Sequence, residues 1–420
     1  MSEIVNTIEG AFAELWPYVD WLFYILFLVF VGKFAEQAWL FARQNWYKRA
    51  AERTLFEIKI PREITRGPKA MDQFFSALHA FMNVPGSLGE KYWDGETTRD
   101  FSFELLGVNG SIHMFMRVPR FYSDAIKAAL YSQYNDLEIV EQKNDYMDRL
   151  PRTYEDLHKI GYEIWGMEAG LERENYFPVK TYAEFEEKSG DERIVDPIAF
   201  FIEVVNNMPD EETIMVQFVM KPIHGSKWQD KGEKHMEDIH EGRKIYKDGE
   251  FMGRYEVETE QAKQTAKSIH SKIAKEGFKT LIRYIHVGPT ATFNMFFGYR
   301  NFFAFFNQLS SDDNAFVKNH KNWTKIDWFI FPFVFPRKRL FERRKKMYKD
   351  FLKRYFPEET WLGKFWRSGF WIDDFCHLTP ILNTEELATL FHPPTEVVIT
   401  TGLMDRVESK RIAPPSDLPA

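Results

Sequence analysis

The residues from 233 to 243, EKHMEDIHEGR, carry the kinds of side chain that bind divalent metals. His235 and His240 are separated by Glu237 and Asp238 within a helical pattern. Two ligands on one helix face need a spacing of three or four residues, whereas a spacing of five turns the histidines to different sides. We therefore expect a solvated helix here and no metal site.

The single cysteine is a second candidate for chemistry. Cys376 follows Asp374 by two residues and immediately precedes His377. Neighbours in sequence do not form a nucleophile and its base, so we expect a buried structural thiol. One cysteine also excludes an intramolecular disulfide and any cysteine-rich zinc or iron–sulfur site.

Phosphate-binding sequences are missing from the chain. It has no G-x-x-x-x-G-K-[S/T] loop to cradle a triphosphate, and no G-x-S-x-G nucleophile elbow. Gly107 and Gly110 flank a predicted hairpin and not a strand-to-helix turn, which argues against a dinucleotide fingerprint. We expect neither catalysis nor a bound cofactor.

The composition indicates a folded chain. With 420 residues, 44% of them hydrophobic and 17% aromatic, there is material for two or three domains with cores. The net charge of −7 argues against a surface that is wholly a nucleic-acid footprint, although a local basic stripe remains compatible with it.

Residues 1–50 predict a membrane anchor. The run Trp21 to Gly32 has no charge, and the apolar helical pattern continues beyond Lys33 to Phe41. Because a span needs roughly 20 apolar residues, Lys33 must extend towards one interface. The alternative is a helix that lies in the interface or against a partner. The span itself depends on Trp21, Leu22, Phe23, Ile25, Leu26, Phe27, Val29 and Phe30.

Charges on the two sides of this run predict its orientation. Glu3, Glu9 and Glu14 precede it, while Arg43 and later cations follow it. The positive-inside rule then places the N-terminus outside and the body in the cytoplasm, with a single pass through the cytoplasmic membrane. An acidic start is also unlike the basic start of a cleaved signal peptide.

Residues 51–145 predict a first α+β half. Alternating and helical patterns follow one another in the order βαββαβ, the split βαβ or ferredoxin-like motif. Asn109-Gly110 is a strong hairpin signal between its second and third strands. The expected strands and helices cover residues 55–61, 69–81, 101–108, 111–119, 122–134 and 137–142.

Residues 146–330 predict a second ferredoxin-like half with longer spacers. A polar insertion, 226–277, separates its last strands, and its helical patterns at 227–246 and 256–276 indicate a helical hairpin. The helix Phe296 to Phe306 carries more aromatic residues than one face can hold. It therefore packs between the two halves or binds a partner.

Residues 331–380 contain a basic amphipathic helix. Between Arg337 and Arg354 ten Lys or Arg face two acidic residues, a local charge of +8. Such helices lie on anionic membranes or grip nucleic-acid phosphates, or they dock the apolar stripe on the core and turn their charges to water. The expected surface contacts are Arg337, Lys338, Arg339, Arg343, Arg344, Lys345, Lys346 and Lys349.

Residues 381–420 combine a capped helix with a proline-rich tail. Asn383 is placed to cap a helix from Thr384 to about Phe391, with acidic residues in its first turn. Pro393 and Pro394 then force an extended exit.

Three stretches together resemble the membrane-anchored N-terminal regions of conjugative, type IV secretion-like coupling ATPases of small-genome bacteria and some archaea. They are LFEIKIPREITRGPKAMDQFFSALH, IHSKIAKEGFKTLIRYI, and NTEELATLFHPP with the later RVESKRIAPPSDLP. In that family the last stretch immediately precedes the ATPase domain. The segment that the resemblance assigns to ATPase coupling comprises Asn383, Glu385, Glu386, Leu387, Phe391, His392, Pro393, Pro394, Pro414 and Pro415.

The resemblance implies a non-catalytic membrane subunit that docks a transport ATPase moving DNA or protein. We expect a separate gene to supply that P-loop motor, or the sequence to have been cut at the domain boundary. An oligomer within a larger assembly is also expected. The alternatives are a membrane-associated nucleic-acid-binding protein that uses the basic helix, and a structural subunit of a cell-surface assembly.

Overall fold

The computed structural model describes residues 2–61, 66–187, 196–225, 227–241, 243–247, 250–255, 260–326, 335–357 and 379–394. The chain forms two compact units. A helix unit comprises Met1–Ala50, Pro85–Thr97 and Pro357–Gly369, and a sheet unit comprises Ala51–Val84, Thr98–Phe356 and Phe370–Ala420. The limits predicted for the five sequence regions stay predictions.

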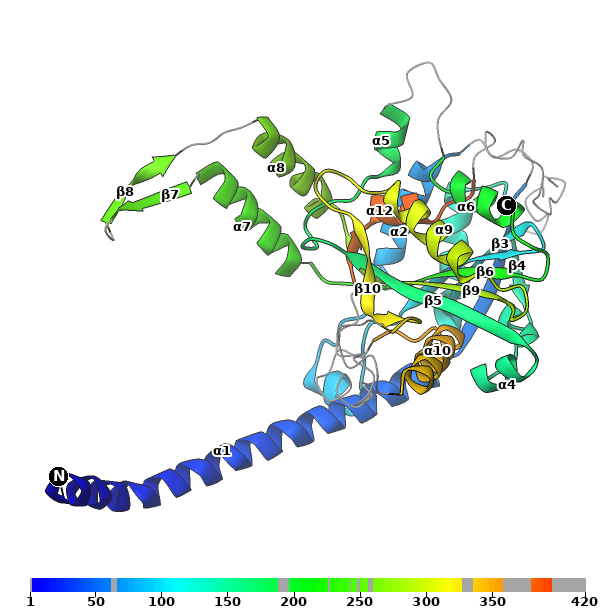
Figure 1. The fold of residues 1–420 in the computed structure, drawn as a ribbon. Helices are drawn as coiled ribbons and strands as arrows, with labels where there is room; N and C mark the ends of the chain where they lie inside the picture. Colours follow the sequence, from blue (N-terminus) through cyan, green and yellow to red (C-terminus); the bar gives the residue numbers. More distant parts are fainter. Residues whose placement is uncertain are drawn as a thin grey trace, which may run out of the picture. The chain divides into compact units, whose positions relative to one another are not determined.

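The helix unit is built on α1, Ser2–Ala50, a single helix of 49 residues (Figure 1). Its portion Trp21–Ala50 is long and apolar enough to cross a membrane. A turn of π-helix, η1 (Glu90–Asp94), contacts the second half of α1. The eight residues on which the predicted span depends are all more than half exposed, as a lipid-facing helix requires.

The sheet unit contains one large antiparallel sheet with the strand order β10-β5-β9-β6-β2-β3-β1-β4, and β11 pairs with β9 as well. All the recorded pairs are antiparallel. The strands are β1 (Arg53–Lys59), β2 (Phe101–Val108), β3 (Ser111–Pro119), β4 (Glu138–Gln142), β5 (Tyr162–Leu171), β6 (Thr213–Pro222), β9 (Gly277–Pro289), β10 (Phe316–Trp323) and β11 (Ile381–Asn383).

The predicted hairpin joins β2 to β3. Asn109 and Gly110 have φ values of 49° and 72°, the left-handed pair that a two-residue turn of this kind demands. Val108 and Ser111 are therefore register partners, and the two strands remain paired as far as Ser102 and Arg117.

Helices cover both faces of this sheet. On the first face, alternate strand residues such as Phe103, Val216 and Ile282 form the main core. The helices that contribute to it are α2 (Pro68–His79), α3 (Ser123–Gln133), α5 (Tyr182–Glu187), α6 (Ala199–Asn206), α9 (Met295–Asn307) and α12 (Thr384–Leu390).

The intervening strand residues face a second, smaller core. Met215 and Ile285 are among them. The elements that complete this core are α4 (Tyr154–Lys159), α10 (Pro336–Leu352) and the 3-10 turn η3 (Tyr146–Arg149), while the short η2 (Arg120–Tyr122) precedes α3. Figure 1 shows α10 and α4 on the side of the sheet away from α2 and α12.

The insertion differs from the predicted helical hairpin. Its helices, α7 (Lys227–Glu241) and α8 (Glu260–Ile273), are shorter than expected, and β7 (Arg243–Lys247) pairs with β8 (Glu250–Tyr255) at their far end (Figure 1). The intervening sequence Asp248-Gly249 is a hairpin signal, and β-branched and aromatic neighbours favour strands there. The two predicted helices are present and contact each other, but the helical pattern was wrongly extended across the strand pair between them.

The phenylalanine-rich helix α9 lies on the sheet and does not separate two halves. It contacts β5, β9 and α6. Phe302, Phe305 and Phe306 are buried, whereas Phe296 is 61% exposed. The buried aromatic side chains of α9 therefore fill the space between the sheet and α6.

Candidate functional site

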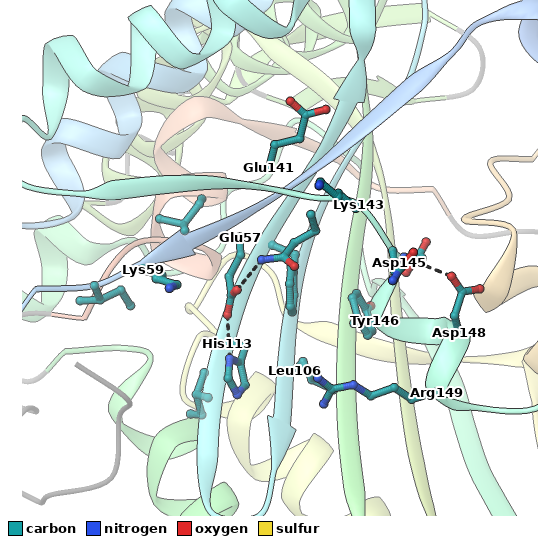
Figure 2. Close-up of a pocket in the computed structure, with 16 residues that line it drawn as sticks. Glu57, Lys59, Leu106, His113, Glu141, Lys143, Asp145, Tyr146, Asp148 and Arg149 are labelled. Atoms are coloured by element: carbon teal, nitrogen blue, oxygen red, sulfur yellow. Dashed lines mark hydrogen bonds and ion pairs between the residues drawn. The ribbon is translucent and has the colours of Figure 1, made fainter. Parts of the chain in front are cut away.

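A hollow of about 1080 Å³ opens on the second face of the sheet, over the strands β4, β1 and β3. Strand alternation produces it, because residues such as Phe56 and Ile58 point into the main core while Glu57 and Lys59 point the other way. Figure 2 shows Glu57 and His113 side by side on its floor, and Tyr146 and Arg149 to one side.

Glu57 is the centre of the floor. Its Oε1 lies 2.9 Å from Nδ1 of His113, and its Oε2 accepts a hydrogen bond of 2.7 Å from the amide of Gln142. The bond from His113 lowers the pKa of Glu57, and burial opposes this shift. The three residues come from three adjacent strands, so the strand order alone brings them together.

An aromatic pair forms one wall of the hollow. Phe115 of β3 stacks on Tyr146 of η3 with 4.6 Å between ring centroids. Asp145 and Asp148 cap η3 reciprocally, which fixes the position of Tyr146. Hydrogen-bonding groups of both charges beside an aromatic surface can bind a polar ligand or a peptide segment.

This hollow was not predicted from the sequence. The alternating pattern predicted β1 and β3, but no role was assigned to their polar positions. A signal was present, since Glu57 and His113 are titratable residues that each lie between two apolar neighbours in their strands.

A buried row of polar residues lies beside the hollow and holds α10. Glu104, Gln217, Arg283 and Glu168 occupy matched positions on β2, β6, β9 and β5, and we call them the polar row. Arg283 pairs with Glu168 at 2.8 Å, and both side chains are fully buried.

The polar row binds the end of α10. Arg283 donates to the carbonyl oxygens of Asp350 and Tyr355, and Gln217 donates to that of Phe351. Carbonyl groups at a helix C-terminus lack partners within the helix. Those of Asp350 and Phe351 accept these side-chain bonds in addition to backbone bonds from Tyr355 and Arg354.

Arg354 completes the attachment. Its guanidinium binds Glu104 at 2.6 and 2.9 Å and also contacts Asp145, so it links the polar row to the wall of the hollow. Arg354 has a left-handed backbone with φ of 48°, a conformation that persists only where surrounding contacts enforce it.

Many of the cationic side chains of α10 therefore have partners within the sheet unit. Arg343 is buried and donates to the carbonyl oxygen of Lys325, Arg344 pairs with Glu163, and Lys345 pairs with Glu155. Lys346 lies 3.8 Å from Asp350 and is partly buried, as is Arg339. The exposed members of the predicted set are Arg337, Lys338 and Lys349.

The C-terminal segment is part of the core. Asn383 accepts from the backbone of Glu386 while Glu386 accepts from that of Asn383, which confirms the predicted cap. Leu387 and Phe391 are buried in the main core. The remaining residues of the predicted set that lie in the described chain are the partly buried Glu385 and the buried His392, Pro393 and Pro394.

One buried ion pair and one buried histidine–carboxylate contact hold this segment. Glu386 lies 3.0 Å from Lys272 of α8, and Nε2 of His392 lies 2.8 Å from Asp196. Glu385 contacts Lys275 at 2.8 Å. The predicted Pro414 and Pro415 lie outside the described residues, as does Cys376.

His235 has a packing role. Its ring lies 5.2 Å from that of Tyr176 and 5.3 Å from that of Phe177. The side chain of His240 is outside the described part of the structure. Within that part, no three His, Cys, Asp or Glu residues are grouped as metal ligands would be.

The two units define a class of protein with a long apolar N-terminal helix and an α+β body built on an antiparallel sheet. A family model described as a domain of unknown function, DUF8128, matches residues 42–294, which is more than half of the chain. The chain belongs to this family. No curated protein matches it.

Proposed function

We propose that this protein is a non-catalytic membrane subunit that couples a separately encoded P-loop transport ATPase to a type IV secretion-like machine. Support comes from the apolar helix, which is exposed along the stretch that would cross the bilayer. The sequence resemblance supplies the identity of the motor.

The observation that carries the proposal is how residues 381–394 are built into the body. β11 pairs with β9, and α12 packs against α2 on the first face of the sheet. In the proteins that the chain resembles, the ATPase follows this segment. A motor attached beyond Pro394 would therefore pull on a segment that is held by a paired strand and by the buried contacts of Glu386 and His392.

We also propose that the sheet unit consists of two ferredoxin-like halves. We assign each set of four strands to a ferredoxin-like half. The strands β4-β1-β3-β2 have the order fourth, first, third, second, and β10-β5-β9-β6 repeat it. β2 and β6 pair antiparallel, so two such halves share one continuous sheet.

A nucleic-acid role for α10 has less support. Arg343, Arg344 and Lys345 have partners within the sheet unit, which leaves fewer cations for phosphates than the sequence suggests.

Co-purification tests the coupling. Native membranes are extracted in mild detergent with the tagged full chain and with a variant lacking residues 401–420. The full chain should retain a P-loop ATPase, and the deletion should lose it while membrane insertion and folding persist. Equal capture of the same ATPase by both would show that coupling runs through another surface.

The proposed orientation has the N-terminus outside and the body in the cytoplasm. Protease added to intact cells should then spare everything beyond Arg43, and permeabilised cells provide the control. Cleavage within residues 51–357 of the intact cells would reject this orientation.

A further inference from the structure

A short segment of the helix unit is clasped to α1 where the apolar stretch ends. Residues 85–97, which we call the collar, include η1. Side chains and backbone of the collar contact α1. Tyr92 donates its hydroxyl to Glu36 at 2.6 Å, and the carbonyl oxygen of Tyr92 accepts from the indole of Trp39 at 2.5 Å.

The collar follows the backbone of α1 closely. Gly95 has φ of 71°, and a Cβ atom there would lie 2.5 Å from the backbone carbon and oxygen of Arg43. Only glycine permits this approach without displacement. The contact at Gly95 and the bonds of Tyr92 attach the collar to one stripe of α1, at Glu36, Trp39 and Arg43.

Two large apolar side chains of the collar are exposed, beside the exposed polar residues Ser87, Lys91 and Asp94. Leu88 is 75% exposed and Trp93 is 69% exposed. The ring of Trp93 contacts that of Trp39 at 5.9 Å, and Trp46 is exposed further along α1. Such a group of exposed aromatic residues continues the exposed apolar surface of the helix.

Cations are interleaved with these rings. The guanidinium of Arg43 lies 5.2 Å from the centre of Trp46 and 5.9 Å from that of Trp39, and Lys91 lies 5.0 Å from that of Tyr92. Tryptophan and tyrosine with adjacent Lys or Arg are typical of the headgroup layer, where an amphipathic ring and a cation are both well solvated.

The position along α1 fits that layer. At about 1.5 Å per residue, Trp39 lies about 27 Å beyond Trp21 along the axis, close to the hydrocarbon thickness of about 30 Å. The uncharged run from Trp21 to Gly32 is only about 17 Å long on the same measure. Because this run is shorter than the hydrocarbon layer, it does not by itself fix how deeply α1 is inserted. A second structural feature must therefore set the insertion depth.

We propose that the collar is a membrane-interface element. Leu88 and Trp93 insert at the headgroup level of an anionic leaflet, and the clasp on Glu36, Trp39 and Arg43 fixes how deeply α1 is inserted. This inference rests on the proposed membrane span.

Depth-dependent quenching tests the collar in the full-length chain. In a Cys376→Ser background, single cysteines at Leu88, Trp93, Leu26 and Asp136 are labelled with a small fluorophore. The protein is reconstituted into phosphatidylcholine–phosphatidylglycerol vesicles with bromine placed either near the headgroup or near the chain end. Labels at Leu88 and Trp93 should be quenched mainly by the shallow bromine, that at Leu26 by the deep bromine, and that at Asp136 by neither.

The outcomes separate the collar from the span. Quenching at Leu26 without quenching at Leu88 and Trp93 would overturn the collar and keep the span. Loss of quenching at Leu26 would overturn the span itself. Gly95→Ala, combined with the label at Trp93, should remove most of the shallow quenching. If Gly95→Ala leaves that quenching unchanged, α1 does not hold the collar at the interface, which contradicts the proposal.

Discussion

The ammonium nitrogen of Lys272 lies 3.0 Å from Oε1 of Glu386, and neither side chain is exposed. Lys272 belongs to α8 of the insertion, and Glu386 belongs to α12 near the C-terminal end of the described chain. Lys272 also donates to the carbonyl oxygen of Phe177 at 3.0 Å. Burial lowers the pKa of Lys272, and attraction to Glu386 opposes this shift. The pair joins segments that are more than a hundred residues apart.

Lys272→Met should therefore lower the free energy of unfolding by about 3–5 kcal/mol, because it leaves the carboxylate of Glu386 buried without its partner. Urea unfolding of the full chain in mild detergent measures this. The matched control is Lys263→Met on the same helix, whose ion pair with Glu260 is exposed. The control should change stability by less than about 0.5 kcal/mol. Equal effects of the two substitutions would contradict the assigned role of the pair.

Arg354 should be indispensable for the attachment of α10. Arg354→Lys cannot reproduce the four bonds of Arg354 to Glu104 and Asp145, because an ammonium group has only three donors and lacks the planar fork of a guanidinium. We expect a loss of about 3 kcal/mol or more and faster proteolysis within 337–353 under native conditions. Lys353→Met, at the exposed neighbouring position, is the control and should leave the cleavage rate unchanged. Slow cleavage in both variants would mean that contacts other than those of Arg354 are sufficient to hold α10 on the sheet.

The floor of the hollow should make stability depend on pH in the acid range. The folded-state pKa of Glu57 is below 4.5, its ordinary value, so its contribution is present above that pH and is lost as the pH falls through the folded pKa. His113→Asn removes the bond that lowers the pKa. It should cost about 1 kcal/mol at neutral pH and progressively less on acidification.

Urea unfolding at several pH values measures this difference. The same comparison in a Glu57→Gln background is the control, because the carboxylate is then absent. A pH-dependent cost of His113→Asn that persists in that background would assign the effect to another group.

Charge reversals on α10 should have different effects at different positions. Arg344→Glu would face Glu163 in a partly buried site and should lower stability by about 1–3 kcal/mol. Lys338→Glu, at an exposed position of the same helix, should leave stability unchanged. Thermal unfolding of the two variants in parallel checks this prediction. Equal stability of the two would show that the pair with Glu163 contributes nothing measurable.

Local chemistry allowed several elements to be predicted from the sequence. Asn109-Gly110 predicted the β2–β3 hairpin because few residues accept a left-handed backbone, and Asn383 predicted the cap of α12 because the bond of a capping side chain lies within four residues. The apolar run from Trp21 predicted a long apolar helix in the same way, from consecutive residues alone. Each of these signals depends on neighbours in sequence, so the rest of the fold was not needed.

Other features were decided only by the tertiary structure. Glu57 and His113 meet because β1 and β3 are adjacent in the sheet, and Arg344 meets Glu163 across 181 positions of sequence. The stretch from Arg337 to Arg354 has the same ten cations and apolar stripe whether its helix docks on the sheet or lies on a membrane. Which cations find carboxylates depends on strand order and register, and these are set by the burial of both sheet faces over the whole chain.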